Sequence, residues 1–302
     1  MRIQNRFSII FFFLTATIRV LGQQVADESF NYEIKHPAYQ REKGSVITLD
    51  EAHFNFHTLK GRYAAFGRVL QNDGYIMKSS LVPFTLSSLS GTKVLVIANA
   101  LPDTLEWKLP ARPAFTKEEV TALHKWVSEG GSLFLIADHM PFPGAVAPIA
   151  ESFGFNLING FAFRKDKKPE FFSRKRGTLA VNVITNGRNG SERIDSIKVF
   201  TGEAFVPPPG ATVISRLDDN YQVLMPNIAW EFDEKTPSIS GRNLVNGAFM
   251  EYGKGRIVVM GEAAMFSAQI SGEKNKMGMN DPDAKQNPQF LLNIIHWLDR
   301  KL

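Results

Sequence analysis

The stretch Trp-Val-Ser-Glu-Gly-Gly-Ser-Leu-Phe-Leu-Ile-Ala-Asp-His, residues 126–139, decides the fold. It completes a helical pattern in which Val120, Leu123 and Val127 recur at the spacing of one helix face, and its two glycines end that helix. The run at 132–137 is apolar without alternation, which is typical of a strand buried on both faces of a sheet. A helix followed by such a strand predicts a parallel sheet covered by helices.

The same alternation of strands and helices extends in both directions from this stretch. It predicts an α/β fold with a doubly wound, mainly parallel sheet of the flavodoxin-like kind. Strands are predicted at residues 45–50, 75–77, 93–98, 132–137 and 255–260. Helices are predicted at 58–72, 117–128, 145–153, 263–269 and 288–298, with Thr58, Thr116 and Asn287 as N-caps and Glu119 completing a capping box at Thr116.

Residues 155–250 do not continue this alternation of strands and helices. Their segments are short and interrupted by proline and glycine, most plainly at residues 207–210. Strands are predicted at 178–185 and 211–217. We therefore expect a single domain over residues 23–302 with a β-rich insertion at about 155–250.

Residues 1–22 are typical of an export signal. Arg2 and Arg6 give a charged start, and an apolar run follows that is shorter than the roughly 20 residues a membrane span needs. Cleavage would leave an exported protein, periplasmic or secreted, without a stable membrane span; an uncleaved anchor is the alternative. Arg19 lies unusually close to the expected cleavage point.

Charge and cysteine content exclude several classes of protein. The whole chain carries a formal charge of +5, which falls to +2 without residues 1–22, so nothing points to a nucleic-acid partner. The densest basic runs, 164–168 and 174–176, are interpreted as solvated loops, with a surface that binds an acidic partner as the alternative. The chain has no cysteine, which excludes disulfides, thiolate metal sites and a cysteine nucleophile.

Polar side chains follow four of the predicted strands. Ligands of open parallel sheets bind beyond the carboxyl ends of the strands, so these side chains form the candidate site. Asn99 follows one strand, and the others end in acids or imidazoles. The candidate catalytic residues are Asp50, His53, His57, Asp138, His139 and Glu262, and the candidate substrate-binding residues are Asn55, Arg62, Asn99 and Arg188.

The segment 53–57 places two imidazoles close together. Whether it is extended or helical, His53 and His57 are expected on one face, with Phe54 and Phe56 available as anchors. His53, His57, Asp138 and His139 could together hold a divalent metal, namely zinc, manganese or iron, and activate a water molecule. However, no His-Glu-x-x-His motif occurs, and the alternative is that these side chains only bond to backbone or stabilise turns.

Five stretches of the chain resemble the class I glutamine amidotransferase-like superfamily, in a branch near gliding-motility and intraflagellar-transport domains. They are residues 49–53, 115–119, 126–139, 255–262 and 287–297. The resemblance implies the flavodoxin-like sheet. Catalytic members of that superfamily use a cysteine on the turn that corresponds to residues 137–139, where this chain has none. Glutamine amidotransfer is therefore excluded.

Two functions remain open from the sequence. The first is an exported hydrolase-like enzyme that uses the histidines and carboxylates, with Arg62 or Arg188 steadying an anionic group of the substrate. The second is a non-catalytic module of the cell envelope that binds a carbohydrate, another small molecule or a protein. Its support is the aromatic content of residues 155–250: Phe161, Phe163, Phe171, Phe172, Phe200, Phe205 and Trp230.

Overall fold

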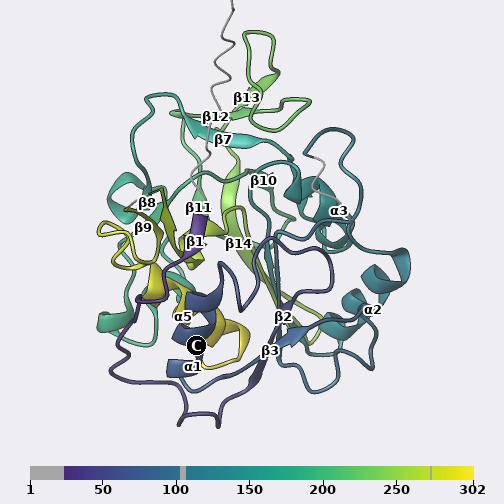
Figure 1. Cartoon of the computed structure of the whole chain (residues 1–302), viewed down its shortest axis with the longest axis vertical. Coiled ribbons are helices and arrows are strands. Elements are labelled where there is room, and N and C mark those ends of the chain that lie inside the picture. Colours follow the sequence, from purple (N-terminus) through teal and green to yellow (C-terminus); the bar gives the residue numbers. More distant parts are fainter. Residues whose placement is uncertain (1–23, 103–106, 273) are drawn as a thin grey trace, which may run out of the picture.

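The computed structural model describes residues 24–102, 107–272 and 274–302 (Figure 1). The predicted export signal at 1–22 lies outside these residues. Within them, no helix has both the length and the apolar character needed to cross a membrane.

A parallel sheet forms the centre of the molecule. Its five strands lie in the order β3-β2-β4-β5-β15, and every neighbouring pair among them is parallel. Numbered along the chain this order is 2-1-3-4-5, the flavodoxin-like arrangement. The predicted mainly parallel α/β sheet is thus confirmed. The strands are β2 (Val46–Asp50), β3 (Ile76–Ser80), β4 (Val94–Ala98), β5 (Ser132–Ile136) and β15 (Gly255–Met260).

Helices cover both faces of this sheet, as the labels in Figure 1 show. On β4, Val94, Val96 and Ala98 belong to one apolar cluster, whereas Leu95 and Ile97 belong to the other. Successive side chains of a strand point to opposite faces, so both faces need apolar residues and the strand reads as a continuous apolar run. The first cluster includes α1 (Ala64–Asn72) and α5 (Asn287–Leu298); the second includes α2 (Lys117–Ser128) and α3 (Phe142–Ser152).

Antiparallel strands extend the sheet beyond β15. The strands β6 to β13 all fall between residues 155 and 250, where a β-rich region is predicted. The antiparallel strands of the large sheet are β14 (Val245–Tyr252), β11 (Thr212–Arg216), β10 (Phe205–Val206) and β6 (Asn156–Leu157). Small sheets contain β7 (Phe161–Arg164), β12 (Tyr221–Leu224) and β13 (Ser238–Ser240); β8 (Glu170–Ser173) and β9 (Ser196–Val199); and β1 (Gln24–Ala26), β16 (Ala268–Ser271) and β17 (Asn275–Gly278).

Two predicted elements are wrong. The expected strand at 178–185 contains a short helix, α4 (Val183–Asn186), because the Asn182 side chain accepts a hydrogen bond from the Thr185 amide at 2.9 Å and caps it. The expected helix at 263–269 is a single 3-10 turn, η3 (Ala264–Phe266), which leads directly into β16. Two further 3-10 turns are η1 (Arg174–Arg176) and η2 (Gly190–Glu192).

Three predicted helix starts also shift. α1 begins at Ala64, because the Thr58 carbonyl accepts hydrogen bonds from Gly61 and Tyr63 in a turn before it. α3 begins at Phe142, three residues early. Asn287 is the first residue of α5, and its buried side chain bonds to the backbone of β9 instead of capping the helix.

Candidate functional site

Four of the predicted site residues lie along one edge of the parallel sheet. Asp50 is the last residue of β2, and Asn99, Asp138 and Glu262 follow the neighbouring strands β4, β5 and β15, so the fold brings their positions to the same rim. Asn99 links two of these strand ends, since its side-chain oxygen accepts a hydrogen bond from the Asp138 amide at 2.8 Å. The backbone therefore brings these four strand ends to one edge of the sheet, as expected.

The loops at this rim close over the point between β2 and β4 where the strand order reverses. The Phe56 amide donates to the Asn99 carbonyl at 3.0 Å, and the Leu101 amide donates to the His53 carbonyl at 2.9 Å. Flavodoxin-like folds commonly bind ligands at this switch point. Here the chain's own backbone pairs across it.

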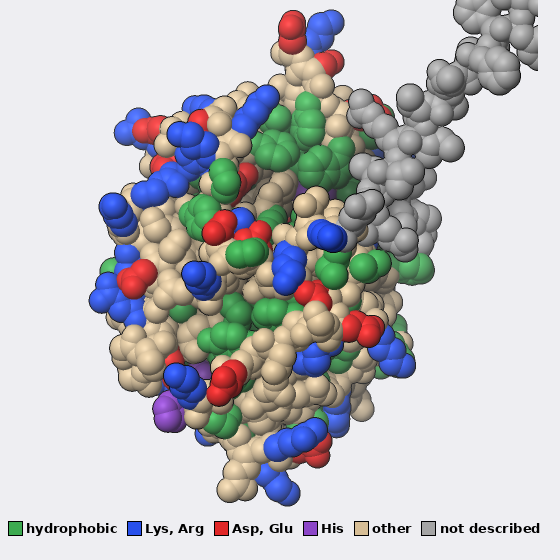
Figure 2. Space-filling view, turned by 60° about the vertical axis from the view of Figure 1, so that its left-hand side comes forward, with side chains coloured by type: hydrophobic (Ala, Val, Ile, Leu, Met, Phe, Trp, Pro, Cys, Tyr) green, Lys and Arg blue, Asp and Glu red, His purple; other side chains and the backbone are tan. Residues whose placement is uncertain are grey.

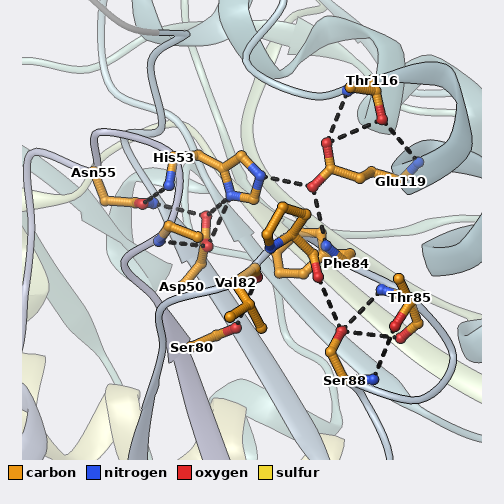
Figure 3. Close-up of polar contacts among 12 residues, drawn as sticks. Asp50, His53, Asn55, Ser80, Val82, Phe84, Thr85, Ser88, Thr116 and Glu119 are labelled. Carbon is orange, nitrogen blue, oxygen red and sulfur yellow. Dashed lines mark hydrogen bonds and ion pairs between the residues drawn. The ribbon is translucent and has the colours of Figure 1, made fainter.

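His53 lies between two carboxylates (Figure 3). Its Nδ1 is 2.9 Å from Asp50 Oδ1, and its Nε2 is 2.8 Å from Glu119 Oε1. The ring is buried between Phe84 and Phe115, with centroids 4.9 and 4.3 Å away. Burial lowers the pKa of His53, but the Asp50 and Glu119 carboxylates outweigh it, so the pKa is raised overall. Both ring nitrogens are directed at carboxylates, so neither is available to a substrate.

Glu119 has two roles that the sequence only half predicts. Its Oε2 accepts hydrogen bonds from the Thr116 amide and hydroxyl, which confirms the capping box at the start of α2. Its Oε1 accepts one from the Phe84 amide at 3.0 Å in addition to the contact with His53. Burial raises the pKa of Glu119, but these hydrogen bonds lower it overall. Glu119 was missed as a partner of His53 because 66 residues separate them.

Asn55 holds the loop around His53 in place. Its Nδ2 donates to Asp50 Oδ2 at 3.0 Å, and its Oδ1 accepts a hydrogen bond from the His53 amide at 3.0 Å. Its two polar groups are therefore used within the protein, although we predicted that it binds substrate.

His57 faces away from His53, contrary to the expectation that both imidazoles share a face. Its ring packs against Tyr63 with centroids 4.5 Å apart, on the side of the sheet covered by α1 and α5. Burial lowers the pKa of His57 to about 3, so the ring is neutral. The alternation fails because Phe54 has φ of 41°, which breaks the extended course of the loop. The Arg62 guanidinium lies over the Phe56 ring, 3.9 Å from its centroid.

His139 lies among aromatic rings. Its Nδ1 is 2.8 Å from the Met140 carbonyl oxygen, which fixes the ring orientation. The ring stacks on Phe161 with centroids 4.5 Å apart and an angle of 11°, and Trp230 meets it edge-on at 4.7 Å.

The four predicted metal ligands do not form one donor set. His53 faces Asp50 and Glu119, His57 faces Tyr63, and the stacked His139 ring directs Nδ1 at a carbonyl. Among the described residues, no group of three or more His, Asp or Glu side chains is arranged to hold a metal ion. These residues therefore do not fit the zinc, manganese or iron site that we predicted.

Three buried carboxylates lie at this edge of the sheet instead. Burial raises the pKa values of Asp138, Glu203 and Glu262, and the charge of Asp138 raises those of the two glutamates further. Glu262 Oε2 accepts a hydrogen bond from the Met265 amide at 2.9 Å, whereas Oε1 of Glu203 and of Glu262 has no partner among the described residues. Glu203 was not predicted, since it lies between two short strands without a sequence pattern that marks it.

Arg188 lies far from this edge. It pairs with Glu192 at 2.6 Å and donates to the His36 carbonyl at 3.1 Å. Two residues after His36, the Ala38 amide donates to Asp73 at 2.7 Å, and Asp73 precedes the amino end of β3. The structure therefore places Arg188 toward the opposite edge of the sheet from Asp138.

A pocket of about 830 Å³ opens in the β-rich region. Ala162 of β7 donates to the Gly202 carbonyl, and the Glu203 amide donates to the Gly261 carbonyl, so β7 lies beyond the carboxyl end of β15. Figure 2 shows hydrophobic side chains gathered on the upper part of this face, with lysines and arginines beside them. The pocket is lined by Phe163, Arg164, Lys165, Lys167, Lys168, Pro169, Glu170, Lys198, Val199, Phe200, Gln222, Leu224, Phe232, Lys276 and Asp281. None of the six predicted catalytic residues is among them.

Comparison with known proteins shows the fold and nothing finer. No protein-family model matches the chain, and no curated protein matches its sequence. Among solved structures, the mmIFT52 N-terminal domain is 15% identical with a TM-score of 0.57, over 84% of this chain and 97% of that one. A cytoplasmic protein from Salmonella typhimurium LT2 is 12% identical with a TM-score of 0.52, over 84% and 99%.

A third structure concerns the predicted superfamily. It is described as a GMP synthase protein from Thermoplasma acidophilum, and it is 14% identical over 85% of this chain and 97% of that one. Its TM-score is 0.41. The mixed α/β architecture is compatible with an amidotransferase-like fold, and the branch named from the sequence motifs stays a prediction.

Proposed function

We propose that this chain is a non-catalytic binding module, exported to the cell envelope, which holds a carbohydrate in the pocket between β7, β8, β9, β12 and β17. The observation that carries the proposal is the pocket itself. Its volume of about 830 Å³ is in the range of small-ligand sites, and it combines apolar rings with a few polar groups.

The aromatic side chains of the pocket suit a sugar ring. Phe163 and Phe232 both line the pocket and pack edge to face, with ring centroids 5.7 Å apart and an angle of 81° between the ring planes. Phe163 also stacks on Phe161 at 5.8 Å, and Phe161 stacks on His139, which holds this wall rigid. The Gln222 amide in the lining can both donate hydrogen bonds to hydroxyl groups and accept them.

The polar groups at the strand ends support binding over catalysis. His53 has both nitrogens directed at carboxylates, and burial keeps His57 neutral. Glu203 and Glu262 are fully buried, so no substrate reaches them without movement of the chain. In this proposal these side chains join the loops at the edge of the sheet, and the pocket beyond them holds the ligand.

A hydrolase remains the second candidate, and one observation favours it. Glu170 lines the pocket, and burial raises its pKa to about 7, which is the range of a general acid at neutral pH. Release of reducing sugar from the bound saccharide would establish this function in place of simple binding.

The proposed function is tested by screening the mature protein against an array of neutral and acidic oligosaccharides, with hits measured by calorimetry. We expect Phe232→Ala to weaken binding of a hit about tenfold or more, because the ring is a wall of the pocket. It is 37% exposed, so the protein should still fold. The matched control is Phe54→Ala, an exposed ring at the sheet edge and outside the pocket lining, which should leave affinity unchanged.

Two results would overturn the proposal. One is that no saccharide binds. The other is that both alanine variants weaken binding equally, since the ligand would then not lie in this pocket.

A further inference from the structure

Basic side chains dominate the lining of the pocket. The lining contains six lysines and arginines but only two carboxylates. The basic residues come from parts of the chain that are distant in sequence. Lys165, Lys167 and Lys168 follow β7, whereas Lys276 lies on β17, more than 100 residues later. A basic run on one loop is usually only solvated. Here three segments, namely the loop after β7, strand β9 and strand β17, bring lysines to one aromatic pocket, which distinguishes this cluster from a solvated loop.

Two of the six cations are already neutralised by the protein. Lys198 is 2.7 Å from Asp281 and 3.5 Å from Asp283, and its side chain is largely buried. Arg164 makes a bidentate pair with Asp166 at 2.8 and 2.6 Å. These pairs fix the walls of the pocket and leave little charge for a ligand.

The other four basic side chains have weaker interactions within the protein. Lys168 is 3.9 Å from Asp166 and 74% exposed, and Lys165 donates to the Asp219 carbonyl. The side chain of Lys167 is exposed and has no hydrogen-bond or ion-pair partner among the described residues. Lys276 is also exposed, and it interacts electrostatically with Asp27 without a hydrogen bond to it. The lining of the pocket therefore has an excess of positive charge beside its phenylalanines.

We infer that the ligand is an acidic saccharide, whose sugar ring contacts the phenylalanines and whose anionic groups pair with Lys167, Lys168 and Lys276. This inference rests on the proposed function and deepens it. Ammonium groups on flexible stems suit carboxylates or sulfates spaced along an oligosaccharide, since each lysine reaches its anion independently. The shared chemistry is an anionic sugar, and the experiment below separates the carboxylate from the sulfate.

Glu170 makes this binding depend on pH. Burial raises its pKa to about 7, so below that pH it is protonated and above it adds a negative charge to the lining. Anion affinity should fall as pH rises from about 6 to about 8, and Glu170→Gln should flatten that change. The charged and titratable groups around Glu170 are Arg164, Asp166, Tyr221 and Glu262.

The test uses the full mature chain and a uronic-acid oligosaccharide, compared with the same oligosaccharide after reduction of its carboxyl groups and with a sulfated neutral one. We expect the reduced sugar to bind about tenfold more weakly, and added salt to weaken only the charged ligands. The double variant Lys167→Gln, Lys276→Gln should weaken the acidic ligand to a similar degree. The matched control Lys60→Gln, Lys117→Gln removes the same charge elsewhere on the surface and should leave affinity unchanged.

The outcomes separate the two claims. If the reduced sugar binds as well as its acidic parent and the pocket lysines can be replaced without effect, the inference is wrong and the binding module stands. If no sugar binds, the proposed function fails as well. Tight binding of the sulfated sugar alone would keep the anionic class and assign sulfate as the charged group.

Discussion

Replacing Glu119 with alanine should lower the free energy of unfolding by about 3 to 5 kcal/mol, the usual cost of removing one partner from a buried ion pair. The variant leaves the buried His53 ring with Asp50 as its only carboxylate partner. It also removes the acceptor of the Phe84 amide and half of the capping box of α2. Urea unfolding followed by circular dichroism measures the change.

Glu118→Ala is the matched control for this prediction. Glu118 lies in the same first turn of α2 but is exposed, so its replacement should change stability by no more than about 0.5 kcal/mol. Equal losses for the two variants would show that the contacts of Glu119 with His53 and Phe84 do not stabilise the fold.

Glu262→Gln should raise the free energy of unfolding at about pH 8. The gain should exceed the effect of the same substitution at about pH 4 by more than about 1 kcal/mol, since each unit of pKa shift is worth about 1.36 kcal/mol. Burial raises the pKa of Glu262 well above that of an ordinary glutamate, and the charge of Asp138 adds to this. The folded state then binds more protons than the unfolded state. The contribution of Glu262 to the free energy of unfolding is therefore fully present below the pKa of an ordinary glutamate. It is lost as the pH rises through the pKa of Glu262 in the folded state.

Glutamine removes that loss because it stays neutral at every pH, and it can keep the hydrogen bond from the Met265 amide. Melting temperatures of wild type and variant across this pH range measure the effect. Glu28→Gln, at an exposed position, should show the same small difference from wild type at both ends of the range. A Glu262→Gln protein whose advantage does not grow with pH would contradict the assignment of a buried, proton-holding carboxyl.

The central sheet could be predicted from the sequence because its signals are local. The strands β4, β5 and β15 are buried on both faces, so their apolar runs are continuous and easily found. The capping box at Thr116 also lies within four residues of sequence, and the helix it predicts matches α2 at both ends. Elements set by side-chain bonds to distant backbone, such as Asn287 with Lys198, carry no such signal.

The candidate site could be predicted only in part. The sequence placed Asp50, Asn99, Asp138 and Glu262 at one edge because the fold alone decides where strand ends lie. It could not show the direction of each side chain. A single left-handed residue, Phe54, turns His53 and His57 to opposite faces, and nothing in the residue type of phenylalanine predicts that backbone conformation.

The pocket could not be predicted from the sequence either, because the residues that line it are distant along the chain. Its lining joins residues 163–170, 198–200, 222–232 and 276–281, which meet only through the pairing of short strands. The aromatic content of the region was visible in the sequence, and so was the basic run at 164–168. Their meeting in one hollow with Lys276 depends on the tertiary fold.

The most direct test of the central claim is a crystal structure of the mature protein with a saccharide identified by the array. The account predicts the sugar ring against Phe163 or Phe232, with its anionic group within about 4 Å of a pocket lysine, the limit for an ion pair. A ligand bound instead at the strand ends, against Asp138 or His139, would contradict it and return the function to that edge.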